Sequence, residues 1–149
     1  MINSFQGEYR FLSNFHPCTI VYEEITYPSV EHAYQAAKTN NLSHRHCIAA
    51  TSSPGLAKRL GRRVPIRPDW EQKKLQIMYQ LCRQKFFKNE TLAQQLKTTG
   101  DQPLIKGNAW NDTFWGICNG RGQNHLGKIL MIIRQQLNDN ESTEKEELN

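Results

Sequence analysis

The chain has 149 residues, of which 38% are hydrophobic and 22% charged, and this is enough for one domain with its own buried core. The longest unbroken apolar run covers residues 129–133, far short of the roughly 20 residues that a membrane helix needs. No basic segment followed by an apolar stretch stands at the start, so we expect a cytoplasmic protein rather than a secreted or membrane protein.

The net charge is unevenly distributed along the chain. Residues 139–149 carry a net charge of −4, which leaves +9 on residues 1–138. Between Lys58 and Lys74 there are seven basic residues against two acidic ones. Such a segment attracts phosphate-bearing partners, although a solvated face without a partner is an equally good interpretation. The acidic end predicts a disordered tail at 139–149, after one domain at 1–138.

The cysteines give no sign of a metal site. They stand at positions 18, 47, 82 and 118, too far apart in sequence for a C-x-x-C pair. The nearest histidines, His44 and His46, have no acidic residue beside them. We therefore expect reduced thiols in a cytosolic protein, with neither a metal ion nor a cofactor.

The predicted elements begin with a hairpin. Residues 19–22 and 25–27 are typical of two short strands around a tight turn. Ser29 can then cap a helix over residues 30–38, which Asn41 helps to close.

The rest of the chain predicts helices joined by two longer loops. Ser53 and Pro54 open a helix that stops at Gly61, and Asn89 caps another that ends near Gly100. The remaining predicted elements are a short helix at 44–50, a loop at 62–68, a long helix opening at 69–72, a brief strand at 104–105, a structured loop at 107–124 and a helix at 124–137. The apolar stripe of the long helix consists of Leu75, Met78, Leu81, Cys82 and Phe86. The predicted class is a mainly α-helical α+β domain with a small N-terminal β-hairpin.

Three segments, 11–15, 29–32 and 107–116, carry polar and aromatic residues where packing does not require them. The second and third segments also have a plain structural explanation, because Glu31 suits the first turn of a helix and Asp112 suits a turn. No Walker A loop and no G-x-G-x-x-G turn is present. These patterns indicate an aromatic-lined pocket that tolerates phosphate and holds one or two carboxylates.

The chain resembles the NADAR family, also called YbiA-like, over nearly all of residues 5–137. The resemblance rests on ordered motifs rather than on one signature. They include Phe5 to Phe15 with its Leu-Ser-Asn-Phe end, Tyr27 to Lys38 with Val-Glu-His-Ala-Tyr-Gln-Ala-Ala-Lys, Ser53-Pro54, Asp69-Trp70, Asn108, Asp112, Phe114-Trp115-Gly116 and Asn124 to Met131. The resemblance implies a single YbiA-like domain.

The resemblance also implies an N-glycosidase, which hydrolyses a bond between ribose C1 and a nitrogen. One branch of the family acts on ribosylamino-pyrimidine phosphates of riboflavin synthesis, and another removes ADP-ribose from guanine, including guanine in DNA. The family's catalytic carboxylate matches Glu31, its pocket tryptophan matches Trp70, and its loop acid and tryptophan match Asp112 and Trp115.

The expected site combines these matches with side chains suited to such a ligand. Glu31 and Asp112 are the candidate catalytic residues, because a carboxylate stabilises an oxocarbenium-like ribose. Glu31 is preferred to Asp112 because Trp70 and Tyr34 can supply a partly apolar wall beside it. The expected ligand-binding residues are Ser13, Asn14, His32, Tyr34, Gln35, Lys58, Arg62, Trp70, Lys74, Asn108 and Trp115. Lys106 departs from the pattern, because many relatives carry an acid there, and its effect on activity stays open.

Three functions remain open at this point. The first is removal of ADP-ribose from guanine, with ADP-ribosylated DNA as a substrate and a cognate ADP-ribosyltransferase toxin as a possible partner. The second is hydrolysis of riboflavin-pathway intermediates. The third is a module that binds ADP-ribose without turnover.

Overall fold

The computed structural model describes residues 1–148. The chain divides into two compact units. Residues 14–85 form the first, here called the central unit. Residues 1–13 and the chain from Phe86 onward form the second, here called the terminal unit.

The central unit begins with the predicted hairpin. Strands β1 (Ile20–Tyr22) and β2 (Ile25–Tyr27) pair antiparallel, with Ile20 opposite Tyr27. The turn residues Glu23 and Glu24 have φ angles of 45° and 71°, as a tight two-residue hairpin turn requires. Because Ile20 and Tyr27 are fully buried, one face of the hairpin closes the core of this unit.

Side-chain caps set the starts of the next three helices. The helices are α1 (Val30–Ala37), α2 (Leu42–Ala49) and α3 (Pro54–Gly61). Ser29, Asn41 and Ser53 each accept a hydrogen bond from the backbone N–H three residues later. Ser29 and Ser53 were predicted in this role, whereas Asn41 starts α2 two residues earlier than predicted.

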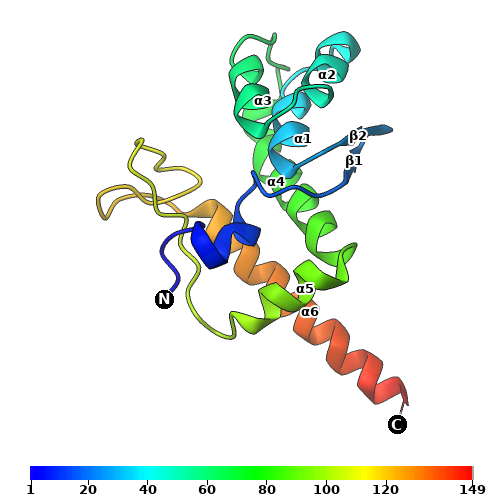
Figure 1. Ribbon diagram of the computed structural model, residues 1–149, viewed down its shortest axis with the longest axis vertical. Helices are drawn as coiled ribbons and strands as arrows, with labels where there is room; N and C mark the ends of the chain where they lie inside the picture. The colour runs from blue at the N-terminus through cyan, green and yellow to red at the C-terminus, as the bar shows by residue number, and fades with distance from the viewer. Residues whose placement is uncertain (149) are drawn as a thin grey trace. The chain divides into compact units, whose positions relative to one another are not determined.

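Helix α1 is the centre of this unit. All eight of its residues are buried, because it contacts α2, α3 and both strands, which Figure 1 shows gathered around it. Helix α4 (Trp70–Phe87) follows and belongs to the central unit as far as Lys85. Within the predicted apolar stripe of α4, Leu75 is 41% exposed and so does not belong to the core.

The terminal unit joins the two ends of the chain. A 3-10 helix, η1 (Gly7–Leu12), contacts α5 (Glu90–Thr98), and α5 packs against α6 (His125–Leu148). Ile2 forms a parallel bridge with Leu104, at the position of the predicted strand. No local pattern in the sequence predicts η1.

Helix α6 is longer than predicted. It continues through residues 139–148, where the sequence predicted a disordered end, and Asn149 lies outside the described residues. Glu141 lies 3.1 Å from the ammonium of Lys97 on α5 and 3.5 Å from that of Lys145 one turn later, so two ion pairs support this segment.

These elements confirm the predicted mainly helical α+β class with a small hairpin. No helix within residues 1–148 is long and apolar enough to cross a membrane. All four cysteines are free thiols: Cys47 is exposed, Cys18 half-buried, and Cys82 and Cys118 buried.

Candidate functional site

The first turn of α1 holds Glu31 in a fixed position. Pro28 ends the hairpin, and Ser29 then caps the helix through the backbone N–H of His32 at 3.1 Å. The backbone N–H of Glu31 donates to the carbonyl of Asn14 at 3.1 Å. The backbone on both sides of Glu31 is therefore fixed before any ligand arrives.

The Glu31 side chain is only 7% exposed, although it is a carboxylate. The Nε2 amide group of Gln35, one turn later, donates to its Oε1 at 2.8 Å. The Oε1 of Gln35 is buried and has no hydrogen-bond partner among the described residues. Buried polar atoms are almost always paired in folded proteins, so this unused acceptor beside a buried carboxylate is typical of a ligand site.

The position of Gln35 depends on a glycine in the neighbouring helix. Gly61, at the end of α3, lies so close that a methyl group on it would overlap the Gln35 amide. This close approach explains why a helix-ending glycine faces α1 there, and it keeps Gln35 against Glu31.

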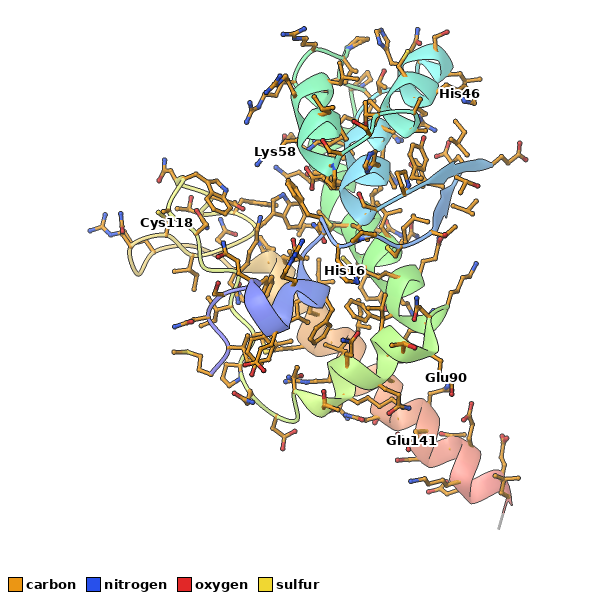
Figure 2. The ribbon with its side chains drawn as sticks, viewed as in Figure 1. His16, His46, Lys58, Glu90, Cys118 and Glu141 are labelled. Atoms are coloured by element: carbon orange, nitrogen blue, oxygen red, sulfur yellow. The ribbon has the colours of Figure 1, made fainter. Side chains whose placement is uncertain are left out.

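Positive charge gathers around Lys38, the residue that follows the last residue of α1. Lys38 lies two turns after Glu31 on α1, and burial lowers the pKa of its ammonium. The charges of Arg62, Lys58 and Lys74 lower that pKa further, whereas Glu31 raises it. Lys58 extends from α3 (Figure 2). Glu31 and three further cations therefore lie within electrostatic reach of Lys38. One of these cations, Lys74, is also paired with Glu71 at 2.7 Å.

Lys38 is a candidate site residue that was not predicted from the sequence. The sequence does contain a pattern that groups it with Glu31 and Gln35, because positions 31, 35 and 38 fall on one helical face at spacings of four and three residues. Its ammonium also lies 5.7 Å from the centre of the Tyr34 ring, within the range of a cation–π contact.

Two expected ligand-binding residues of this unit have partners inside the fold. The ring of His32 bonds to the Ser29 hydroxyl at 2.7 Å through Nδ1 and to the Thr51 carbonyl at 3.2 Å through Nε2. Since a carbonyl only accepts, Nε2 carries a proton. Burial lowers the pKa of the ring, which favours the neutral form in which Nδ1 accepts from the Ser29 hydroxyl. The Asn14 side chain bonds to the sulfur atoms of Met78 and Cys82.

Trp70 and Tyr34 form an aromatic wall. Their ring centres are 5.1 Å apart at an angle of 50°, and the two residues are 5% and 7% exposed. At this exposure Trp70 packs against α1 and presents little open face for stacking. The pair supplies an apolar surface within the unit that holds Glu31.

The terminal unit holds the other predicted catalytic residue, Asp112, in a network of bonds. The Lys106 ammonium lies 2.8 Å from its Oδ2, and the backbone N–H of Trp115 donates to its Oδ1 at 3.0 Å. Burial would raise the pKa of this carboxyl, but Lys106 and the backbone donors outweigh burial and lower it. Asp112 is thus an ionised anchor of the 107–118 loop, paired with the lysine that departs from the family pattern.

Asn108 organises the same loop. Its amide group donates to the carbonyls of Asp112 and Ile117, and its Oδ1 accepts from the backbone N–H groups of Asp112 and Trp110. These bonds use all the hydrogen-bonding positions of an asparagine side chain. The Asn108 side chain therefore stabilises the loop and directs its hydrogen bonds to the loop backbone.

The half-buried Trp115 belongs to an aromatic cluster. Its ring lies 4.8 Å from that of Phe114, which lies 4.6 Å from that of His125 at the start of α6. Ser13, at the end of η1, bonds through its backbone N–H to Arg10.

The expected site residues thus form two sets, each within its own unit. Glu31 and Gln35 are in contact, and Lys58, Arg62 and Lys74 lie within electrostatic reach of Lys38 in the same unit. The central unit also contains Asn14, His32, Tyr34 and Trp70. The terminal unit contains Ser13, Asn108, Asp112 and Trp115. Residues 1–148 contain no group of three metal-ligating side chains.

Comparison with known proteins agrees with the motifs. The NADAR domain family model matches residues 3–138. The chain is 36% identical over 137 residues to the N-glycosidase YbiA of Escherichia coli, covering 90% of this chain and 85% of that protein. It is 38% identical over 132 residues to a riboflavin biosynthesis protein of Vibrio vulnificus, but spans only 36% of that longer protein's length.

A solved structure gives the same result for the fold. The NMR structure of Escherichia coli YbiA matches with a TM-score of 0.81 and 34% identity, covering 95% of this chain and 89% of that one. Because the family model spans nearly the whole chain and the structural match extends equally far, this protein belongs to the NADAR domain family.

Proposed function

We propose that the protein is an N-glycosidase that hydrolyses a bond between ribose C1 and a nitrogen, with Glu31 as the catalytic carboxylate. The observation that carries this proposal is the buried Glu31 carboxylate, bonded to Gln35 and adjoining an unused acceptor. The N-glycosidase name of the YbiA relatives supports the same reaction class.

The chemistry follows from the charge that develops during cleavage. As the C1–N bond breaks, its electron pair stays with the nitrogen and the ribose becomes an oxocarbenium-like cation. A negative charge held near C1 stabilises that cation, and a carboxylate can take a proton from the attacking water. The water oxygen bonds to C1, and the leaving nitrogen gains a proton. The free acceptor of Gln35 suits a ribose hydroxyl or this water as its donor.

The cations around Glu31 suit a phosphorylated ribose. Lys38, Lys58, Arg62 and Lys74 can neutralise phosphate oxygens while Glu31 keeps its charge for the sugar. We take ADP-ribosylated guanine as the substrate, because a pyrophosphate uses several cations and residues 1–138 carry a net +9. An ADP-ribosyltransferase that modifies guanine would supply this substrate in the cytosol.

A second substrate has a specific observation in its favour. Relatives from Vibrio vulnificus and maize carry names of riboflavin biosynthesis proteins. Ribosylamino-pyrimidine phosphates contain the same C1–N bond and one phosphate, so the same carboxylate and fewer cations would serve.

The decisive experiment compares Glu31→Gln with a matched control. Glu31→Gln keeps the shape of the side chain but removes its charge, so turnover should fall by roughly 10²–10³ while ADP-ribose affinity changes far less. Glu90 on α5, labelled in Figure 2, is also an acid in the first turn of a helix. Glu90→Gln should therefore lose only the interaction with the helix dipole and keep near-normal turnover.

The assay is run on ADP-ribosylated guanosine and on the pyrimidine intermediate separately, with base release and melting temperature recorded for each variant. Normal base release by a folded Glu31→Gln protein would reject Glu31 as the catalytic group. Tight ADP-ribose binding by the wild type without release from either substrate would instead favour the binding module.

A further inference from the structure

The hydrogen bonds of Glu31 suit a group that receives a proton. Gln35 gives its carboxylate an N–H donor and leaves its own acceptor unpaired, whereas a neutral carboxyl group would need an acceptor for its own proton. Cleavage of a C1–N bond also needs a donor, because the leaving nitrogen keeps the electron pair of the bond and has to gain a proton. A group other than Glu31 is therefore needed as the acid.

Lys38, at the end of α1, lies on the same helical face as Glu31. The two positions are seven residues apart, which is about 10 Å along the helix axis. Side chains of a helix lean toward its N-terminus, so the long side chain of Lys38 extends back along this face. Its ammonium lies 5.7 Å from the centre of the Tyr34 ring, one turn earlier, and within electrostatic reach of Glu31.

The backbone of Lys38 is held in place, whereas its ammonium is left for a ligand. The carbonyl of Lys38 accepts from the backbone N–H of Arg67 at 2.7 Å, and the Arg67 guanidinium is paired with Asp69 at 2.6 Å. With residues 1–148 the ammonium forms no ion pair and no hydrogen bond beyond its contact with the Tyr34 ring. A gap therefore separates it from the Glu31 carboxylate. Enzymes that cleave glycosidic bonds with an acid and a base on opposite sides keep the two groups roughly 6.5–9.5 Å apart.

The surroundings of Lys38 favour release of its proton. Burial lowers the pKa of the ammonium most, and the nearby charges of Arg62, Lys58 and Lys74 lower it further. Glu31 acts in the opposite direction and raises it. A general acid works best when its pKa is close to the working pH, and burial brings a lysine closer to that range.

We propose that Lys38 is the general acid of the reaction and that its ammonium donates a proton to the leaving nitrogen. As the C1–N bond breaks, its electron pair stays on the nitrogen and forms the new N–H bond. The water oxygen bonds to C1, and one proton of that water passes to Glu31. Exchange with solvent then removes the proton from Glu31 and restores the Lys38 ammonium. This inference rests on the proposed function and gives Lys38 a role beyond neutralising phosphate.

The test compares Lys38→Arg with Lys38→Met on the two substrates named above. Arginine keeps the positive charge, but its guanidinium does not give up a proton in proteins. For Lys38→Arg, kcat should therefore fall by roughly 10²–10⁴ while ADP-ribose affinity stays close to that of the wild type. Lys38→Met should lose as much kcat and also bind ADP-ribose more weakly. The control is Lys73, which is exposed on α4, and both Lys73→Arg and Lys73→Met should keep the wild-type kcat.

A pH profile adds a measurement that a purely structural role of Lys38 would not change. The kcat of the wild type should fall at alkaline pH as Lys38 loses its proton, and the residual kcat of Lys38→Met should not show this fall. The proposal would be overturned by the same alkaline fall in Lys38→Met, or by a folded Lys38→Arg protein with the kcat of the wild type. Either result leaves the proposed function standing. A wild type that releases no base from either substrate would instead reject the proposed function, and the role of Lys38 with it.

Discussion

Lys85 is a charged side chain that the fold removes almost completely from water. It is 2% exposed in α4, and burial lowers the pKa of its ammonium to about 8 from an ordinary 10.5. The thiols of Cys82 and Cys18 face the same region, and any negative charge on them would raise that pKa. A buried ammonium costs free energy while it holds its proton, so this residue should make stability depend on pH.

The direction of this pH dependence follows from the number of protons bound by the folded and the unfolded chain. Between about pH 8 and 10.5 the unfolded chain keeps the Lys85 proton and the folded chain has lost it, so stability rises with pH. Relative to Lys85→Met, the wild type should gain about 1.4 kcal/mol of unfolding free energy per pH unit across this range. Urea unfolding at several pH values measures the difference. The exposed neighbour Lys88, changed to methionine, should show no such trend, and a flat difference for Lys85→Met would contradict the assignment.

At the same scale, residue type predicted which polar side chains lie in contact better than it predicted what each of them bonds to. Glu31 and Gln35 were expected in the site and do contact each other. His32 and Asn108 were expected to bind ligand, but their polar atoms already bond within the fold. A sequence shows a polar group but not its partners, which for His32 lie 3 and 19 residues away and for Asn108 lie 4 and 9 residues away.

At the scale of elements, the contact between α1 and α3 holds the catalytic candidate in place. A methyl group at Gly61 must displace Gln35, which bonds to Glu31. Gly61→Ala should therefore lower turnover by up to about 10²-fold, because small displacements of catalytic groups are costly. Gly55→Ala in the same helix is the matched control, since its methyl would meet only the Ser53 hydroxyl, at 3.9 Å.

The outcome is read from kcat and from melting temperature together. Gly55→Ala should keep full turnover and gain a little stability from better helix propensity. Equal activity of Gly61→Ala and the wild type would show that Gln35 does not need to stay against Glu31.

Elements with a local signal were predictable, and those formed by distant contacts were not. The caps Ser29, Ser53 and Asn89 mark helix starts through bonds to the third residue after them, which the sequence displays directly. The 3-10 helix η1 packs against α5, and no local sequence pattern predicts a contact between Gly7–Leu12 and Glu90–Thr98, which lie so far apart in the chain.

At the scale of the whole molecule, composition alone was a poor guide to the end of the chain. The acids after residue 138 resemble a solvated tail, yet α6 includes them to Leu148. The Lys97–Glu141 pair joins α5 to this segment across 44 positions, and only the packed helices reveal it. The division of the chain after residues 13 and 85 could likewise not be recognised in the sequence, because the terminal unit is assembled from both ends of the chain.

The placement of the four thiols turns the cysteines into reporters of local opening. With a maleimide reagent, Cys47 should react first, because it alone is exposed. Cys18 should follow slowly, since burial raises the pKa of its thiol and leaves little thiolate.

Cys118 and Cys82 then report on one unit each. Cys118 lies in a loop where it exchanges two backbone hydrogen bonds with Arg121, so a small local opening exposes it. Cys82 sits inside α4, and burial raises the pKa of its thiol to about 12, so reaction requires the helix to open. Peptide mass spectrometry over time should find Cys118 modified before Cys82, with only Cys82 strongly accelerated by denaturant. Identical rates would mean that the two units open as one cooperative body.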